Sequence, residues 1–371
     1  MIKKKLFAVR LVILICISII LAGIYGIKNN NNIIKDYKTY YNAVKEAIYN
    51  YNDTLVIDVQ NYDKNIYSSD VVKKVLVDNP QLLDNEMAYT LKIQSIPFIT
   101  KMTFKFSYGE SKETLQNKEK AVQNKVKDII SKVIKPDMKD YEKEVALHDY
   151  IVNNSKYDER IDSGNMPKES YSSYGVLING VGVCQSYAVA MDRLLKASGI
   201  ETKLALGDAY DGKNWISHAW NVVKIGGQYY NLDTTWDDPI TDDGSNIIRY
   251  SYFNVTDEQI EKNHRWNKVD FPKCNSTEYS VNNLHLVEKD SKGNVIIITK
   301  NYDEFYESVK KGLSSGKASA SFKILSFDNN QQNIENAIVR AYKSAGKYGE
   351  FTYLYFKDDI MNCGYVTVNF K

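Results

Sequence analysis

The sequence predicts an α+β protein in which a central domain, built from helices and an antiparallel sheet, is flanked by two smaller α+β modules. Two observations lead to this prediction. In the middle of the chain, Cys184 opens an expected helix, and His218 and Asp233 lie on the two strands of an expected hairpin. Toward the two ends, one pattern of a helix followed by a strand, a helix and two strands occurs twice. The predicted boundaries are 1–32 for a targeting segment with a spacer, then 33–110, 111–274 and 275–371.

Length and charge limit the classes of function. With 371 residues, the chain is long enough for two or three domains and a sizeable core. The formal net charge is +2, and charged residues make up 25% of the sequence. Such a balanced chain has no general electrostatic attraction for a polyanion, so we predict no nucleic-acid partner.

The N-terminus has the pattern of a targeting segment. Three lysines at 3–5 and Arg10 precede an uncharged apolar run over residues 11–27. A basic flank before such a run is typical of a membrane anchor or of a signal peptide. The run is shorter than the about 20 residues that a spanning helix needs, but Arg10 can snorkel and extend it back to Leu6. We expect a single-pass anchor that holds an extracytoplasmic body at the cell surface; secretion after signal cleavage is the alternative.

The front module, residues 33–110, is expected to alternate helices and strands. Aromatic and apolar residues recur at helical spacing over 37–49. Ser69 is a candidate N-cap for a second helix, which Asn79 and Pro80 end. The expected elements are a helix at 37–49, a strand at 54–59, a helix at 70–77 and paired strands around 88–93 and 102–108.

The central domain, residues 111–274, begins with two expected helices. The first carries an apolar stripe on a highly charged background and ends at Lys135 and Pro136. After a glycine-punctuated loop, a third helix starts at Cys184 and ends at Gly199. Alternating residues then indicate strands. The expected elements are helices at 112–134, 140–153 and 184–198, a loop at 175–182, and strands at 218–225 and 228–235.

The tail, residues 275–371, follows the front module in the order of its elements. The helix at 37–49 and a tail helix share aromatic and apolar residues at equal spacing: Tyr37, Tyr40, Tyr41, Val44 and Ile48 against Tyr302, Phe305, Tyr306, Val309 and Leu313. Helical periodicity alone makes such coincidences common, so a repeated module and chance similarity both stay open. The expected elements are strands at 294–299, 318–327, 351–356 and 364–370, and helices at 302–313 and 333–345.

Cys184 is the candidate nucleophile. As the first residue of a helix, it lies where partial positive charge and free N–H groups favour a thiolate and can stabilise an oxyanion. A free cysteine is more commonly a small buried apolar residue. The position of Cys184 at the junction of a glycine-containing loop and a helix favours the reactive role.

His218 and Asp233 are the candidate partners of this thiol. With the glycine pair 226–227 as a two-residue hairpin loop, His218 lies opposite Thr235 and Trp220 lies opposite Asp233. All four side chains then share one face of the sheet, and His218 and Asp233 are diagonal neighbours that can meet. A three-residue loop would place the two on opposite faces. A base beside a thiol and a carboxylate that orients the base are what a cysteine nucleophile needs.

Other uses of these residue types are weaker. Zinc sites need several cysteines or histidines, and no second one lies at ligand spacing from Cys184. The sequence also has no Walker-type phosphate loop and no serine nucleophile elbow. We therefore predict no metal and no cofactor. Cys274 and Cys363 remain as a candidate pair, but a body of this size does not need a disulfide, and we favour two free thiols.

Several stretches of the central domain form one ordered set. They are GVCQSYA at 182–188, GI at 199–200, HAWNVV at 218–223 and YNLDTTWDDP at 230–239, with HDYIV at 148–152 and YD at 157–158 before them. This set resembles the transglutaminase-like domain. YFNVTD at 252–257 with His264 resembles the segment that often follows the catalytic region in bacterial members. The resemblance covers about Tyr141 to Trp266 and leaves both flanking modules out.

The resemblance implies a papain-like fold, in which a helix bearing the cysteine packs on an antiparallel sheet bearing the histidine and the aspartate. It implies that Cys184 is the nucleophile, His218 the general base and acid, and Asp233 the orienting carboxylate. It also implies acyl transfer from an amide through a thioester. The thioester is then released to an amine, which is cross-linking, or to water, which is hydrolysis. The expected substrates are protein or cell-wall peptide amides.

Three further residues are candidates for the site, and a second function stays open. Tyr174 is the candidate for a second oxyanion donor beside the Cys184 N–H group. Trp220 and Trp236 are candidates for walls that exclude water, although plain core packing explains them equally well. The competing interpretation is a catalytically silent surface scaffold or binding protein that retains the fold. The intact Cys, His and Asp weigh against it, and the flanking modules weigh slightly for it. The sequence gives no oligomeric state.

Overall fold

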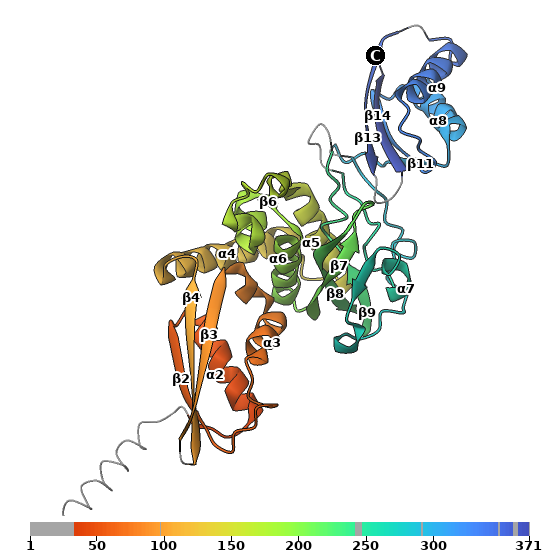
Figure 1. Cartoon of the computed structure of the whole chain (residues 1–371). Helices are drawn as coiled ribbons and strands as arrows, with labels where there is room; N and C mark the ends of the chain where they lie inside the picture. The colour runs from red at the N-terminus through yellow and green to blue at the C-terminus, as the bar shows by residue number, and fades with distance from the viewer. Residues whose placement is uncertain are drawn as a thin grey trace, which may run out of the picture. The chain divides into compact units, whose positions relative to one another are not determined.

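The structure, a computed structural model, describes residues 33–96, 98–241, 247–290, 292–347, 349–358 and 363–370 (Figure 1). The chain divides into two compact units. The first runs to Leu76 and resumes over Met87–Gly109, and the second consists of Val77–Glu86 and the chain from Glu110 onward. The predicted anchor at residues 11–27 lies outside the described residues. Within the described ranges, no helix is both long and apolar enough to cross a membrane.

The first unit is a four-stranded sheet with two helices packed against it (Figure 1). Its strand order is β1-β2-β4-β3, with β1 and β2 parallel and the other neighbours antiparallel. The first helix begins where the Asp36 carboxylate accepts the Thr39 N–H at 2.7 Å, a side-chain N-cap. The elements in chain order are β1 (Ile33–Ile34), α2 (Tyr37–Tyr49), β2 (Thr54–Val59), α3 (Asp70–Asp78), β3 (Met87–Ile96) and β4 (Ile99–Tyr108).

The C-terminal part of the second unit has the same topology. Its sheet has the order β11-β12-β14-β13, with β11 and β12 parallel and the other neighbours antiparallel. Two helices again pack against the sheet (Figure 1). The elements are β11 (Ile297–Thr299), α8 (Tyr302–Ser314), β12 (Ser319–Ile324), α9 (Gln331–Ser344), β13 (Phe351–Asp358) and β14 (Cys363–Phe370).

The two modules also correspond residue by residue over their first half, at the offset that separates Tyr37 from Tyr302. Ile33 faces Asp58 in one module, and at the same offset Ile298 faces Lys323 in the other. The buried positions of the first helix repeat as well: Tyr40, Val44, Ala47 and Ile48 in α2 against Phe305, Val309, Gly312 and Leu313 in α8. Equal strand order and equal register support a repeated module over chance similarity.

Between the modules, the second unit contains a four-stranded antiparallel sheet of order β10-β7-β8-β9. A short parallel pair, β5 (Lys156–Tyr157) and β6 (Val181–Gly182), leads into the helix that carries Cys184. The other elements are α4 (Lys112–Val133), α5 (Asp140–Asn154), α6 (Cys184–Ala197), β7 (Thr202–Tyr210), β8 (Trp215–Ile225), β9 (Gln228–Leu232), α7 (Asp257–Ile260) and β10 (His264–Trp266).

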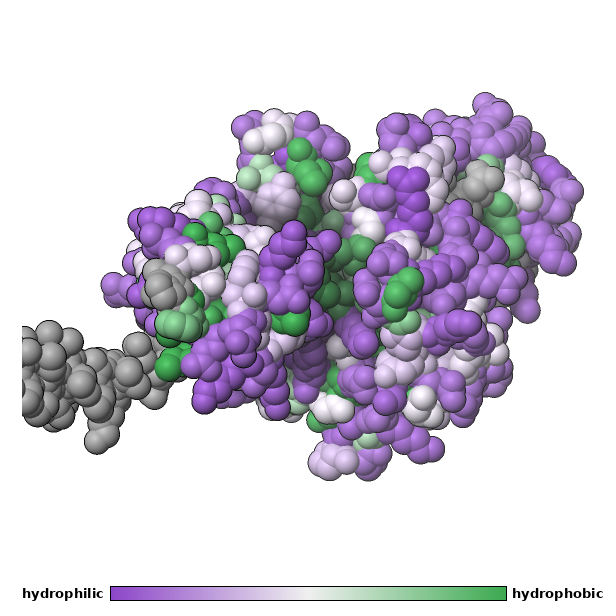
Figure 2. Space-filling view, turned by 60° about the horizontal axis from the view of Figure 1, so that its bottom comes forward, coloured by the Kyte–Doolittle hydropathy of each residue, from purple (hydrophilic) through white to green (hydrophobic). Residues whose placement is uncertain are grey.

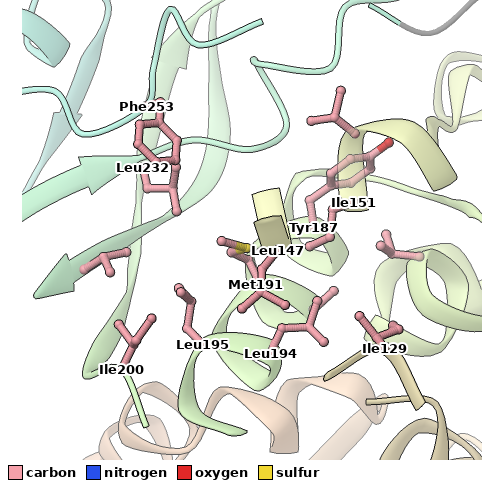
Figure 3. Close-up of a cluster of buried hydrophobic side chains, with 14 of the residues drawn as sticks. Ile129, Leu147, Ile151, Tyr187, Met191, Leu194, Leu195, Ile200, Leu232 and Phe253 are labelled. Carbon is pink, nitrogen blue, oxygen red and sulfur yellow. The ribbon is translucent and has the colours of Figure 1, made fainter. Parts of the chain in front are cut away.

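Helix α6 lies in the main core of this central part. Figure 3 shows its buried side chains meeting others from α4, α5 and the sheet: Ile129, Leu147, Ile151, Tyr187, Met191, Leu194, Leu195, Ile200, Leu232 and Phe253. The apolar stripe predicted for this helix is therefore buried, as expected. Truncating one such side chain to alanine costs about 2–5 kcal/mol. Since packing holds the helix along its length, the position of Cys184 at its start is fixed.

Several predicted elements differ from the structure: β12 ends at Ile324, β8 begins at Trp215, and β7 and β10 are strands that the sequence does not predict. The loop expected at 175–182 contains a π-helical turn, Gly175–Asn179, which Gly180 ends at φ +70°. The strand expected to reach Thr235 ends at Leu232, because the Asp233 carboxylate accepts backbone N–H groups two and three residues ahead and turns the chain. The strand expected from residue 294 begins at Ile297, since the residues before it bridge to an earlier segment.

The two modules differ in what covers the sheet face that points away from their helices. In the C-terminal module, Lys323 and Ser321 on this face are buried; Lys323 Nζ lies 2.7 Å from Glu288 Oε1, and the Ser321 hydroxyl donates to Asp290 at 2.8 Å. The equivalent position to Ser321 in the first unit is Val56, which is 38% exposed. Elsewhere the face drawn in Figure 2 is mostly hydrophilic, with hydrophobic residues in small separate patches.

Candidate active site

Cys184 is the first residue of helix α6, as predicted, with Val183 as the N-cap. The N–H groups of this first turn have no acceptor within the helix, because the first intrahelical partner, the Val183 carbonyl, accepts from Tyr187. A side chain at position 182 would not fit: a Cβ there would lie 2.2 Å from the Ser186 hydroxyl oxygen. Glycine at 182 therefore lets the chain approach the helix that it leads into.

The thiol of Cys184 is partly exposed, whereas the other two described cysteines are buried. Cys274 and Cys363 are both free. Burial raises the pKa of Cys274 and of Cys363, so both are held as neutral thiols. Of the three, only Cys184 combines access with a helix N-terminus.

The hairpin has the register that the glycine pair predicts. Ile225 faces Gln228 and Asn221 faces Leu232, with both loop glycines at positive φ. Strand β9 covers β8 only over Asn221–Ile225. His218 therefore lies on the part of β8 that has a neighbouring strand, β7, on one side only.

His218 and Asp233 meet, although Asp233 lies in the turn after β9 and not on the strand itself. His218 Nε2 lies 2.7 Å from Asp233 Oδ2. Burial alone would lower the pKa of His218, but the charge and hydrogen bond of Asp233, together with the Cys184 thiol, raise it to about 10. With Nε2 occupied by Asp233, Nδ1 is the ring nitrogen left for the thiol. The three predicted side chains are thus brought together.

The Asp233 carboxylate is fully buried and accepts four hydrogen bonds. Besides His218, Oδ2 bonds to His264 Nε2 at 3.1 Å, and Oδ1 accepts the N–H groups of Thr235 at 3.1 Å and Trp236 at 3.2 Å. Burial alone would raise the pKa of Asp233, but His218 and His264 outweigh it and hold this carboxyl well below its usual range. Asp233 is therefore a fixed anion beside the imidazole.

His264 is the member of this site that sequence reasoning missed. It opens β10, which pairs with β7 so that His264 faces Ala209. The side chain is buried against Trp236, with ring centroids 4.4 Å apart. Its inclusion in a segment that resembles the family was the only signal in the sequence, because the β7 to β10 pairing joins distant parts of the chain.

Trp220 and Trp236 both border the site, as predicted, and both are buried. The His218 ring lies 5.2 Å from Trp236 and 6.2 Å from Trp220, centroid to centroid. The Trp220 indole also donates to Asn231 at 3.1 Å, so it supports the hairpin as well as the imidazole. Both tryptophans contact His264 too, which makes them packing residues of the site.

Tyr174, the candidate second oxyanion donor, lies in a different environment. Its ring packs against the main core, and the Lys118 ammonium lies over it at 5.7 Å from the centroid. Tyr157 is closer to the thiol: burial is the largest cause that raises the pKa of Tyr157, and the Cys184 thiol adds to this effect. Tyr157 lies opposite Gly182 in the β5–β6 pair, next to the start of α6.

A second buried polar pair joins helix α5 to the turn that carries Asp233. His148 Nε2 of α5 lies 3.3 Å from Asp237 Oδ2, and His148 Nδ1 lies 3.2 Å from Asp149 Oδ1. Burial alone would lower the pKa of His148, but these two carboxylates raise it to about 9. His148 is therefore charged at neutral pH and pairs with Asp237.

The neighbouring Asp238 ties the same turn to α6. The Tyr187 hydroxyl donates to Asp238 Oδ2 at 2.6 Å, and burial raises the pKa of Asp238 to about 7. The Arg249 guanidinium donates to the Trp236 carbonyl and pairs with Asp358 of β13. Through these contacts, Asp237 and Asp238 fix the turn that presents Asp233.

A metal ion would have to use the same atoms. Ligand atoms of His218, Asp233 and His264 all lie within 4.8 Å of one another. His264, which the sequence spacing did not reveal, is the third member of this group. Both imidazole Nε2 atoms, however, are directed at Asp233 Oδ2 by hydrogen bonds. The arrangement suits two N–H donors on one carboxylate and fits a cysteine site without requiring a metal.

Residues 127–234 match the family model described as transglutaminase-like superfamily. The match includes Cys184, His218 and Asp233 and ends before His264. No curated protein sequence matches the chain. Residues 127–234 thus form a transglutaminase-like domain with the papain-like α+β fold that the sequence predicts, and the match indicates a cysteine-dependent enzyme in general.

Solved structures that resemble parts of the chain are distant. One described as a TGase has a TM-score of 0.28 and 13% identity, and the alignment covers 56% of this chain and 59% of that one. A candidate cysteine protease from Cytophaga hutchinsonii has a TM-score of 0.26 and 18% identity, covering 45% and 69%. An arylamine N-acetyltransferase from Bacillus cereus, described with a Cys-His-Glu triad, has a TM-score of 0.25 and 17% identity, covering 30% and 49%. Similarity at this level carries no argument about function.

Proposed function

We propose that the transglutaminase-like domain is a cysteine acyltransferase or hydrolase that acts on amides of proteins or cell-wall peptides. The observation that carries this proposal is the 2.7 Å contact between His218 and Asp233 beside the thiol at the start of α6. A base oriented by a buried carboxylate and a nucleophile at a helix N-terminus are the parts that thioester chemistry requires.

In the first half of the reaction, the Cys184 sulfur attacks the carbonyl carbon of the amide. The carbonyl oxygen becomes an oxyanion, which the free N–H groups of the first turn of α6 can bind. When the C–N bond breaks, the His218 imidazolium gives its proton to the leaving nitrogen. The products of this half are a free amine, or ammonia, and a thioester on Cys184.

In the second half, His218 takes a proton from an incoming amine or from water, which attacks the thioester carbonyl carbon. The C–S bond breaks and the thiolate returns to Cys184. An amine acceptor yields a new amide, which is cross-linking, and water yields a carboxylic acid, which is hydrolysis. Asp233 stays charged throughout and holds the His218 ring in the orientation that serves both halves.

The test is mass spectrometry of a pool of glutamine- and lysine-containing peptides after incubation with the protein lacking residues 1–32. Joined peptides with loss of ammonia indicate cross-linking, and cleaved backbones indicate hydrolysis. Cys184→Ala should abolish the product, and Asp233→Asn should slow it by roughly 10³–10⁴-fold, since the imidazole loses its orienting carboxylate. Cys363→Ala is the matched control, because this thiol is free and buried in the C-terminal module.

A catalytically silent scaffold is the alternative. The wild-type protein would then leave the whole peptide pool unchanged. Alkylation of Cys184 would also be no faster than that of an ordinary exposed thiol, and its rate would not depend on His218. Reaction of Cys184 with iodoacetamide below neutral pH, lost in His218→Ala, contradicts the scaffold.

We also propose that residues 1–32 hold the body at the outer side of a membrane, with signal cleavage as the alternative. The basic flank and apolar run support this placement. Cell fractionation with N-terminal sequencing tests it. Recovery of the uncut chain in the soluble cytoplasmic fraction would contradict both forms.

A further inference from the structure

Two imidazoles are directed at one carboxylate oxygen in this site. Asp233 Oδ2 lies 2.7 Å from His218 Nε2 and 3.1 Å from His264 Nε2. A cysteine nucleophile needs only one base and one orienting carboxylate, so the reaction described above leaves His264 without a role. The residue also lies beyond the stretch that matches the family model, which ends at 234.

The place of His264 is set by the sheet. Strand β10 pairs with β7, where Trp266 faces Gly207, and Gly207 also faces His218 on β8. One glycine thus lies between the strands that carry the two histidines. A Cβ at Gly207 would lie 2.2 Å from the Arg265 carbonyl oxygen, so the missing side chain is what lets β10 approach.

The ring of His264 is also fixed in orientation. His264 is 1% exposed and packs between aromatic rings, with centroid distances of 4.4 Å to Trp236 and 5.1 Å to Trp220. Its Nδ1 lies 2.8 Å from the side-chain oxygen position of Asn263. The aromatic packing and the Asn263 contact together fix the ring so that Nε2 points toward Asp233.

The two histidines differ in charge. Burial lowers the pKa of His264, and the charge on His218 adds to this, against the raising effect of Asp233. A neutral ring has a single N–H group, and bonding to a carboxylate places it on Nε2. Nδ1 lies beside Asn263, whose amide nitrogen in turn donates to the Tyr252 hydroxyl at 2.6 Å. His264 is thus a neutral donor beside the charged His218.

We propose that His264 is a positioning residue that holds the Asp233 carboxylate against His218 and shares its negative charge. The proposal rests on the function proposed above. An oxygen that accepts two hydrogen bonds is a weaker acceptor for each of them. His264 therefore keeps the ion pair between Asp233 and His218 from becoming so strong that the imidazolium retains the proton that the leaving nitrogen needs.

The test uses a matched pair of substitutions that differ in the N–H donor. Glutamine places an amide N–H near the position of His264 Nε2, and methionine has similar length without a donor. The readout is the pH dependence of Cys184 alkylation by iodoacetate, whose charge makes the rate depend on the His218 imidazolium. His285→Gln is the control, because His285 is exposed and far along the chain from the site.

In His264→Met we expect the basic limb of this profile to move up by about half to one pH unit, because Asp233 then holds the imidazolium more tightly. The His264→Gln profile should stay within about 0.3 pH unit of wild type. With a peptide substrate, His264→Met should lower kcat more than it changes KM. If both variants melt normally and their pH profiles coincide with that of wild type, His264 has only a structural role.

A measurement on the wild-type protein covers the case in which a variant does not fold. Nitrogen-15 NMR of the histidine rings over pH 5 to 10 should show, near neutral pH, His264 neutral with its proton on Nε2 and His218 charged. Protonation of His264 before His218 overturns the inference. If wild-type Cys184 shows no reaction with iodoacetate below neutral pH, the proposed function itself fails. If Cys184 reacts below neutral pH but the His264 variants keep the wild-type pH profile, the proposed function stands and only the role of His264 is wrong.

Discussion

Two fully buried carboxyl groups of the central part differ in charge because their partners differ. Asp233 has four donors and stays ionised. Burial raises the pKa of Glu144 to about 8, because the amide of Asn254 and the charge of His148 offset it only in part. Glu144 Oε1 has no hydrogen-bond partner among the described residues. Glu144 is therefore mostly protonated at neutral pH.

Replacing Glu144 with glutamine should make the fold less sensitive to alkali. The pKa of Glu144 is raised from 4.5 to about 8 in the folded state, so the folded protein holds a proton that the unfolded chain releases. The free energy of unfolding therefore falls as pH rises from about 4.5 to about 8. Glutamine cannot ionise and still accepts from Asn254. Thermal melts should show nearly equal Tm values near pH 4 and a Tm higher by several degrees for Glu144→Gln at pH 8.

The exposed Glu307 of α8 gives the control, since Glu307→Gln should follow the wild-type curve at every pH. His148 also loses stabilising charge as pH rises, but it does so in both proteins and cancels in the comparison. A Glu144→Gln curve parallel to that of wild type would mean that the carboxyl is ionised in the folded state.

At this scale the sequence predicts what depends on local geometry. Cys184 at a helix start and the His218 register follow from a glycine pair and a loop length, so both were predictable. Asp233 was placed on a strand, although its carboxylate ends that strand by binding N–H groups ahead of it. His264 was missed, because its contact depends on a strand pairing between distant segments.

At the scale of elements, the close approach of β10 and β7 decides where His264 lies. The pair depends on Gly207, since a Cβ there would lie 2.2 Å from the Arg265 carbonyl oxygen and 3.0 Å from the Trp220 ring. Both neighbours belong to rigid parts of the site. A side chain at this position must therefore displace the strand and not merely a flexible group.

Gly207→Ala should weaken the fold and slow the reaction together. The added methyl group pushes β10 from β7 and moves His264 away from Asp233, at a cost of about 1–3 kcal/mol. Thermal melts and the pH profile of Cys184 alkylation, whose basic limb should move up as in His264→Met, measure the two effects. Leu206→Ala on the same strand is the control, because Leu206 is 42% exposed. A lower Tm without any change in the alkylation of Cys184 would show that the position of β10 does not affect the chemistry.

Helices and strands with strong periodicity were predictable, and the exceptions have physical causes. Helix α2 and strand β2 have the predicted bounds, and α4 and α6 end one residue early. The π-helical turn Gly175–Asn179 was taken for a loop because glycines there suggest irregular backbone. It is held by packing against the core, with Val176 and Leu177 buried, which glycine content alone cannot reveal.

At the scale of the whole chain, two modules of one topology have different surroundings. In the C-terminal module, the outer face of the sheet is covered over β12 and β14, where Cys363 and Tyr365 are 1% and 3% exposed. Ile247 and Ile296 belong to the cluster that covers them. In the first unit the corresponding face carries exposed or half-exposed residues such as Val56 and Asp58. The sequence predicts the shared order of elements, but not this difference, because the cover comes from outside the module.

This difference predicts unequal behaviour of the two modules in isolation. A fragment of residues 33–109 should fold cooperatively, since it contains the sheet and both helices of the first unit. A fragment of residues 297–371 should be less soluble than one that begins at Val287, because the shorter one lacks Glu288 and Ile296, which cover the face around Tyr365. Urea titrations followed by circular dichroism, with dye binding as a measure of exposed apolar surface, provide the comparison. Cooperative unfolding of the short fragment without dye binding would contradict it.

A chain that carries one module twice can mispair its strands while it folds, with β2 taking the place of β12 against β14. The correspondence between the modules makes such an exchange fit in strand order and register. It fails in charge, because Asp58 holds the position of Lys323, whose ammonium lies 2.7 Å from Glu288. An exchanged strand would bring a carboxylate against that carboxylate in a buried place, at a cost of several kcal/mol. The opposite charges at this position therefore favour the pairing of each strand with its own sheet.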